Sequence, residues 1–168
     1  MNIRFFYFLT LLLIFSADIA RAQFTQVRLQ VAGLNCALCA KTTERELRAL
    51  PFISDVKPDL AHNIYVIGFK PGQPVSFGQI SKILRDENFF ITFFKATVNF
   101  DEVKLNGDAF TNGGDTYRLF NPAGKLLTGQ LEFTEVDKGF APRSVSKKYL
   151  GTAAEDPSTA GRVYHLAI

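Results

Sequence analysis

The chain of 168 residues has no Trp, a single Met at its start and only two Cys. One methionine excludes a methionine-rich metal-binding segment, so any metal site must use other ligands. With no long basic run and a net charge of +3, the chain lacks the basic surface typical of nucleic-acid-binding proteins. The linear order contains no recognisable Ser-His-Asp set, phosphate-binding glycine loop or paired-carboxylate site, and we therefore expect no enzyme.

Long hydrophobic runs are also scarce, and the one that stands out lies at the amino terminus. Residues 1–22 combine a positive charge at Arg4, an apolar run over Phe5–Phe15, and small residues at Ala20 and Ala22. This pattern predicts a cleavable secretory signal peptide, because the run is too short to span a bilayer. An uncleaved anchor is the alternative. No later stretch is apolar enough to cross a membrane, so we expect a soluble periplasmic or secreted protein.

Residues 23–100 alternate between strand and helix periodicity. Apolar residues alternate with polar ones in the strands and recur every three or four residues in the helices. The resulting order, βαββαβ, predicts a ferredoxin-like α+β domain with two helices on one face of a four-stranded antiparallel sheet. The expected elements are a strand over Val27–Val31, a helix with its apolar stripe from Ala40 to Leu50, a hairpin of strands starting at Ile53 and Ile64, a helix capped by Ser76, and a strand over Phe94–Phe100.

The expected topology brings three separate loops to one end of this domain. These loops carry Cys36 with Cys39, then His62, and then Phe89 with Phe90. In this connectivity the end of the first strand, the hairpin turn and the end of the second helix all lie at the same edge of the sheet. We therefore expect these side chains to be neighbours.

Residues 101–168 have a different texture, with short β-like runs separated by Asn-, Asp-, Gly- and Pro-rich turns. They predict a second, small all-β domain of barrel or sandwich type, whose role the sequence does not name. Alternatively, this segment is too short for a core of its own and packs on the first domain. The candidate strands are Thr116–Phe120, Leu126–Val136, Val145–Leu150 and Val163–Ile168.

Both cysteines lie three positions apart where a strand is followed by a helix, in the sequence Cys36-Ala37-Leu38-Cys39. Residues at i and i+3 of a helix face the same way, and the positive end of the helix dipole favours thiolates. Two soft thiolates suit a low-coordinate soft cation, copper(I) before all others. Zinc(II) is the second choice, because a structural zinc site needs four ligands and only His62 and His165 could add imidazoles.

The segment Gly33–Cys39, with the strand before it and the helix after it, resembles the heavy-metal-associated (HMA) domain. That family includes copper chaperones, amino-terminal modules of copper-transporting P-type ATPases and a periplasmic mercury-binding protein. The resemblance covers about residues 24–100. It implies that Cys36 and Cys39 are the metal ligands, that mercury(II) is a further possible ion, and that the partner is a protein that donates or accepts the metal.

Other positions carry further implications of the resemblance. Leu34 takes the place of a buried methionine of the family, and the neutral Asn35 favours copper over zinc. Where the family has a lysine or an aromatic residue over the metal loop, this chain offers Phe89 or Phe90. Phenylalanine would shield the site without neutralising an anionic metal complex.

Competing interpretations exist for each of these residues. In an oxidising compartment the two cysteines could form an inert disulfide or a redox-active pair, which would make the protein a thiol-disulfide oxidoreductase or a redox sensor. His62 is either a third ligand or gate, or a solvated turn residue. Phe89 and Phe90 are either site neighbours or core residues. A further possibility is that the first domain serves only association and that the activity lies in residues 101–168.

Overall fold

The computed structural model describes residues 22–33, 36–122, 124–151 and 161–168. The predicted signal peptide therefore lies outside the described residues except for Ala22, and its cleavage and the export of the protein stay predictions. Ala22 itself is the first residue of strand β1 (Ala22–Ala32) and is buried. Within the described residues, the helices are too short and too polar to span a membrane.

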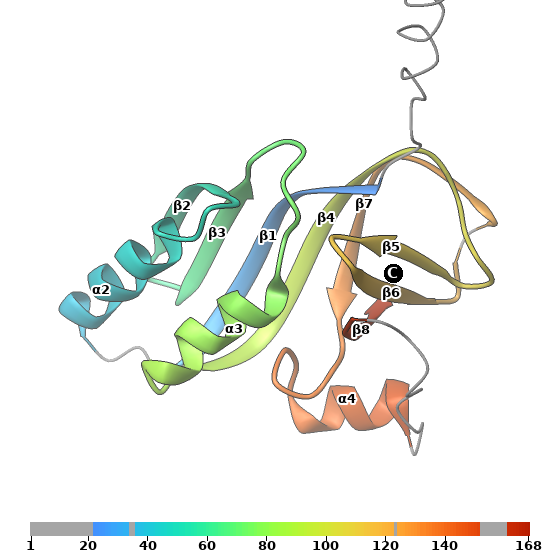
Figure 1. Cartoon of the computed structure of the whole chain (residues 1–168). Coiled ribbons are helices and arrows are strands. Elements are labelled where there is room, and N and C mark those ends of the chain that lie inside the picture. Colours follow the sequence, from blue (N-terminus) through green and yellow to red (C-terminus); the bar gives the residue numbers. More distant parts are fainter. Residues whose placement is uncertain (1–21, 34–35, 123, 152–160) are drawn as a thin grey trace, which may run out of the picture.

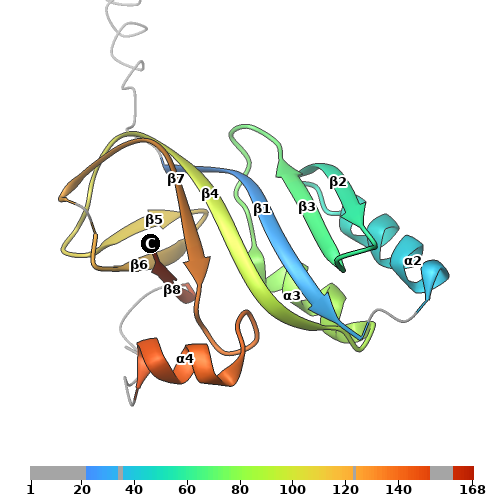
Figure 2. The ribbon, with the colours of Figure 1, turned by 180° about the vertical axis from the view of Figure 1, so that it is seen from behind.

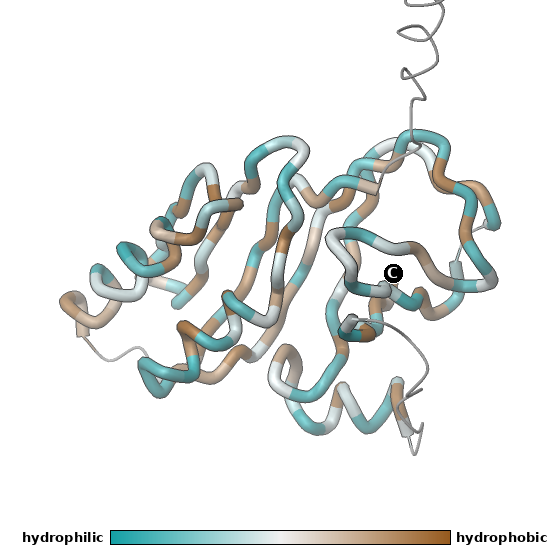
Figure 3. The backbone as a smooth tube through the Cα atoms, in the orientation of Figure 1, coloured by the Kyte–Doolittle hydropathy of each residue, from teal (hydrophilic) through white to brown (hydrophobic). Residues whose placement is uncertain are grey.

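The first half of the chain follows the predicted βαββαβ order. After β1 come α2 (Ala37–Arg48), β2 (Ile53–Asp59), β3 (Ile64–Phe69), α3 (Phe77–Asp86) and β4 (Phe90–Lys104). The four strands lie in the order β2-β3-β1-β4, each antiparallel to its neighbours, and α2 and α3 cover one face (Figures 1 and 2). The strands alternate between hydrophobic and hydrophilic residues (Figure 3), so one face of the sheet packs on the helices.

The second half extends the same sheet instead of building another. It contains β5 (Ala109–Asn112), β6 (Asp115–Phe120), β7 (Leu126–Glu135), α4 (Arg143–Leu150) and β8 (Val163–Ala167). Strand β4 runs through the expected domain boundary at residue 100 and pairs with β7, which gives one sheet of eight strands in the order β2-β3-β1-β4-β7-β8-β6-β5.

The far end of this sheet curls back toward its middle. The edge strand β5 approaches the start of β1, where the Nδ2 of Asn112 donates a hydrogen bond of 2.6 Å to the carbonyl oxygen of Ala22. The ring of Phe24 on β1 lies 6.3 Å from that of Phe110 on β5. The curved part of the sheet therefore includes strands from both halves of the chain. Residues 101–168 thus pack on the first domain, as the alternative interpretation proposed.

A cluster of aromatic rings joins the two halves. Phe77 of α3 lies 4.9 Å from Phe24 and 4.7 Å from Phe94, both in the first half. It also lies 5.6 Å from Tyr117 and 5.4 Å from Tyr164, both in the second half. All five rings are almost completely buried. Edge-to-face and tilted ring contacts at these distances are favourable and bury much apolar area.

Two predictions for the second half are wrong. Residues 145–150 form the end of helix α4 and not a strand, which means that the second half is not all-β. Val145 and Tyr149 stand at the helical spacing of four, and the ring of Tyr149 lies 5.6 Å from Phe120, so that this side of the helix packs on β6. Enrichment in Val, Tyr and Leu suggested a strand, but the spacing of these residues fits a helix.

Candidate metal centre

The loop that carries the cysteines begins at a glycine that no other residue replaces easily. Gly33 follows β1 with a φ of 96°, and a side chain at this position would lie 3.2 Å from the carbonyl oxygen of Asn88. Both features require glycine. The close approach brings the end of β1 next to the connection between α3 and β4, at the lower end of the sheet in Figure 1.

Cys36 is the N-cap of α2, and Cys39 lies in the first turn of that helix. The backbone N–H of Cys39 donates a hydrogen bond of 3.0 Å to Sγ of Cys36. The Cα atoms of the two residues are 5.3 Å apart, and their sulfur atoms form a disulfide. Once the disulfide is reduced, both sulfurs can therefore reach one shared metal ion. An N-cap sulfur that accepts a backbone N–H is also a setting that stabilises a thiolate.

The two sulfur-bearing residues differ in exposure. Cys36 is exposed, whereas Cys39 is half-buried and packs against the hydrophobic core. Between them, Leu38 is 75% exposed, so the start of α2 presents an apolar side chain to solvent. Cys36 is thus the sulfur that an incoming molecule reaches first.

Tyr65 of β3 anchors the first turn of α2, a role that no sequence pattern indicated. Its hydroxyl donates a hydrogen bond of 3.3 Å to the carbonyl oxygen of Ala40, the residue after Cys39. Burial, together with the carboxylate of Glu44, raises the pKa of Tyr65 to about 12, so the hydroxyl stays a donor at any physiological pH. The position of Cys39 is therefore tied to the sheet.

The expected neighbours at this end meet only in part. The hairpin turn does approach β1, since Nε2 of Gln30 donates to the carbonyl oxygen of His62 at 3.0 Å. The imidazole of His62, however, lies 2.8 Å from the carboxylate of Asp59, and this contact lowers the pKa of Asp59. No group of three or more His, Cys, Asp or Glu side chains suited to a metal occurs in the part of the chain that the structure describes. His62 is thus a solvated turn residue paired with Asp59.

The two phenylalanines have opposite environments. Phe89 is buried in the core, next to Gly33, whereas Phe90 is 70% exposed and pairs with Ala32 at the end of β1. Phe90 is therefore the one that faces solvent at the cysteine end. Leu34 and Asn35, for which the resemblance implied further roles, lie outside the described residues.

Solved structures with a similar fold over part of the chain are copper proteins. A yeast copper transporter domain, solved in its apo and Cu(I)-loaded states, is 27% identical, covers 40% of this chain and 90% of its own, and has a TM-score of 0.36. The N-terminal domain of a potential copper-translocating P-type ATPase from Bacillus subtilis is 14% identical, with coverages of 41% and 85% and a TM-score of 0.37.

The chain resembles copper-binding HMA domains over about 40% of its length. We call residues 24–100, over which the sequence resembles the HMA domain, the HMA-like part. No family model matches the chain, and no curated protein matches it. Because the TM-scores lie below 0.5, we draw the function of the HMA-like part from its own residues.

A second group of ionisable residues lies away from the HMA-like part, between β7 and β8. His165 is largely buried, and its Nδ1 lies 2.8 Å from the carboxylate of Asp137. The backbone N–H of Asp137 donates to Oε1 of Glu135, a fully buried residue whose other carboxylate oxygen has no partner among the described residues. Glu135 and Asp137 alternate in the sequence, but His165 lies 28 residues further along, and only the structure brings it beside Asp137.

The stability of the fold should depend on pH through Glu135. Burial, and then the neighbouring Asp137, raise the pKa of Glu135 well above its ordinary value of 4.5. The unfolded chain therefore loses this proton at a lower pH than the folded protein does. Because the folded state holds more protons above about pH 4.5, the free energy of unfolding should fall as the pH rises through this range.

Replacement of Glu135 by Gln should remove this part of the pH dependence. The variant should gain stability relative to the wild type as the pH rises above 4.5, the ordinary pKa of the group, measured by urea denaturation at several pH values. Glu132→Gln, the same change at an exposed position of the same strand, is the matched control and should leave the dependence unaltered. Parallel curves for wild type and Glu135→Gln would contradict the expectation.

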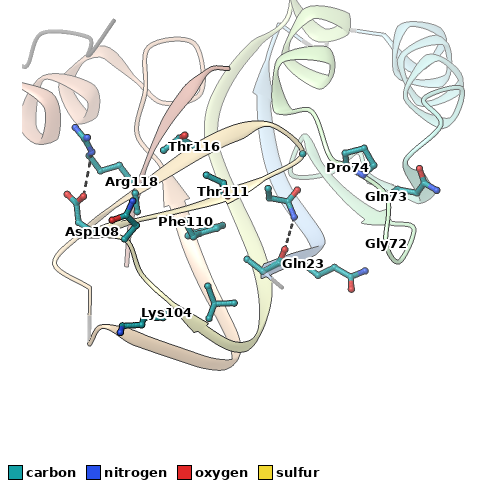
Figure 4. Close-up of a pocket in the computed structure, with 16 residues that line it drawn as sticks. Gln23, Gly72, Gln73, Pro74, Lys104, Asp108, Phe110, Thr111, Thr116 and Arg118 are labelled. Atoms are coloured by element: carbon teal, nitrogen blue, oxygen red, sulfur yellow. Dashed lines mark hydrogen bonds and ion pairs between the residues drawn. The ribbon is translucent and has the colours of Figure 1, made fainter. Parts of the chain in front are cut away.

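A cavity of about 780 Å³ with a mixed polar and apolar lining lies at the opposite end of the sheet from the cysteines (Figure 4). Its walls are the β5–β6 hairpin and the segment around Pro74, and its charged pair is Arg118 with Asp108, whose Nε and Oδ1 lie 3.6 Å apart. The bond from Asn112 to Ala22 closes one side. The sequence predicted no site here, and the cavity has no part in the cysteine chemistry.

Proposed function

We propose that this protein binds copper(I) between the thiolates of Cys36 and Cys39, in an exported compartment, and exchanges it with a partner protein. The observation that carries the proposal is the position of the two sulfurs. They lie within bonding distance of each other at the exposed start of a helix, and the N–H of Cys39 points at Cys36. Such a pair offers two soft ligands in the geometry that copper(I) accepts.

Metal binding requires the reduced form of the pair. A dithiol donor supplies two electrons and two protons, becomes a disulfide itself and converts Cys36 and Cys39 to thiols. Copper(I) then forms two Cu–S bonds as the two thiols release their protons. Zinc(II) fits less well, since a structural zinc site requires four ligands. Mercury(II) has the same preference for thiolates, and a metal competition separates it from copper.

Transfer to a partner follows from the exposure of Cys36. A thiolate of the partner adds to the metal from the solvent side before the first ligand leaves, so the ion is never released. Leu38 and Phe90, which are 75% and 70% exposed, give this end an apolar surface that a partner can cover. Export of the protein rests on the prediction that residues 1–22 are a signal peptide.

The test is a titration of the reduced protein with copper(I) against the chromogenic chelator bicinchoninate, under anaerobic conditions. The reduced protein should withdraw a single copper(I) from the chelator, and the oxidised protein should withdraw none. Equal binding by the two forms would rule out the thiolates as ligands. Displacement of bound copper(I) by an equal concentration of zinc(II) would show that the site prefers zinc(II).

A second function, thiol-disulfide exchange, is favoured by the disulfide itself. The reduction potential separates it from metal binding. A potential in the range of known oxidoreductases, together with rapid exchange with a substrate protein and weak copper binding, would make the protein an oxidoreductase or redox sensor. A potential near that of structural disulfides, or tight copper binding by the reduced form, would exclude this function.

A further inference from the structure

A second cavity, of about 900 Å³, lies between helix α4 and the connection from α3 to β4. Its walls come from the end of α3, the first residues of β4, the segment 138–142 and the side of α4 that carries Arg143, Ser146 and Lys147. Both helices lie at the same lower end of the molecule in Figures 1 and 2. We call this cavity the α4 groove. Its volume falls in the range typical of sites for small molecules.

The inner surface of the α4 groove is mainly apolar. Phe89, Ile91 and Ala141 line it with at most 9% of each residue exposed, and Leu150 adds a half-buried side chain from α4. Ser146 is the one buried residue of α4, so the helix does not close the groove by packing into it. An alkyl chain placed along this surface would remove apolar area from water on both sides.

The charged residues of the α4 groove all have the same sign. Arg85, Lys138, Arg143 and Lys147 line it, and its described lining contains no carboxylate. None of these four forms an ion pair within the described ranges, whereas Arg48 on α2 contacts both Glu44 and Asp55. Arg143 and Lys147 are four residues apart and therefore share one side of α4.

Two of these cations approach the same place from different walls. Arg85 comes from α3, and a side chain at Gly139 would lie 3.9 Å from its Nη1. Lys138 is the residue before Gly139. The guanidinium of Arg85 is held by a hydrogen bond of 3.0 Å to Oγ of Ser81, which leaves its other nitrogens for an anion. A carboxylate near Gly139 would thus meet a fixed guanidinium, a favourable setting for charge-assisted hydrogen bonds, with Lys138 in the same lining.

We propose that the α4 groove binds a long-chain fatty acid, with the alkyl chain on the apolar lining and the carboxylate among the cations. The charge complementarity selects an anion, and the apolar lining selects one with a long hydrocarbon chain. A free fatty acid fits better than a membrane surface, because the apolar residues line a concavity and only Phe90 protrudes, 70% exposed. The proposal requires no metal at Cys36 and Cys39, although Phe90 borders both the α4 groove and the cysteine end.

The test uses a dansyl-labelled fatty acid as a fluorescent probe with the full-length exported protein. Fluorescence should rise to saturation, and dodecanoate should displace the probe, whereas dodecanol, which lacks the charge, should displace it at least about tenfold less effectively. Equal displacement by dodecanol would overturn the proposal, since the cations would then have no role. Absence of saturable binding would overturn it as well.

Charge reversal separates the groove from the rest of the surface. Lys147→Glu and Arg143→Glu should each weaken probe binding by about tenfold, while Lys148→Glu, the same change on the same helix but outside the lining, should alter it less than about twofold. All three positions are exposed, and circular dichroism verifies the fold. Equal effects of Lys147→Glu and Lys148→Glu would overturn the proposal. Co-sedimentation of the protein with phosphatidylglycerol vesicles would also overturn the proposal if dodecanoate did not release the protein. The same holds for binding of an acidic peptide that dodecanoate does not displace.

Discussion

Replacement of either Cys36 or Cys39 by Ser is expected to lower the affinity of the reduced protein for copper(I) by roughly hundredfold or more, because each variant retains one soft ligand. The free energy of unfolding should change little. The disulfide spans a sequence separation of 3, and closing so short a loop removes little entropy from the unfolded chain. Competition with bicinchoninate gives the affinities, and urea denaturation verifies the fold.

Two control variants separate the sulfurs from their surroundings. Ala37→Ser adds a hydroxyl to the same exposed turn and keeps both thiols, so its affinity for copper(I) should equal that of the wild type. His62→Ala should also have no effect, since the imidazole is paired with Asp59. Copper(I) affinity that survives in both cysteine variants would refute the proposed site, and a large loss in His62→Ala would make His62 a ligand.

Replacement of Phe77 by Ala should lower the free energy of unfolding by about 3–5 kcal/mol, the cost typical of a deleted core phenylalanine. Phe77 is fully buried, and its ring contacts aromatic rings from both halves of the chain. The loss should therefore weaken both halves together. Urea denaturation followed by far-UV circular dichroism and by tyrosine fluorescence should give coincident transitions in wild type and variant.

The control for this prediction is Phe90→Ala, the same change at a residue that is 70% exposed. It should alter the free energy of unfolding by less than about 0.5 kcal/mol. If the far-UV and fluorescence transitions separated, or if Phe77→Ala left one of them in place, residues 101–168 would be an independent domain after all.

The sequence was most informative where the structure is local. The strand-to-helix junction at Cys36, the hairpin turn and the cap at Ser76 each depend on a few adjacent residues, and the structure has all of them. For Ser76 the cap is a hydrogen bond of 3.4 Å from the N–H of Gln79. The proximity of the cysteine loop to the end of α3 followed from the connectivity of the βαββαβ order alone.

The side-chain partners in the candidate site were harder to predict from the sequence. His62 could have pointed at the cysteines or at Asp59, and only the turn geometry decides for Asp59. Phe89 lies just before β4 and Phe90 is its first residue, with Phe89 in the core and Phe90 facing solvent, but the sequence does not say which of the two is buried. Tyr65 supports α2 through a single hydroxyl across 25 residues of sequence, a contact that no periodicity reveals.

The second half was the least predictable part. Its strands complete a curved sheet together with β1 and β4, so its core is not encoded in its own sequence but shared with residues such as Phe24 and Phe77. The short helix α4 buries only Ser146, and an almost unburied helix has a weak apolar stripe to recognise. The spacing of Val145 and Tyr149 is the one local indication of this helix, and the enrichment in strand-forming residues outweighed it.

The most direct test of copper(I) binding by the cysteine pair is the metal content and thiol state of the protein purified anaerobically from the cells that produce it. Mass spectrometry of the intact chain and atomic absorption give both quantities on one sample. We predict a single copper bound per chain, with Cys36 and Cys39 reduced and inaccessible to alkylation until the metal is removed. A metal-free chain with an intact Cys36–Cys39 disulfide, even when cells are supplied with copper, would contradict the proposal.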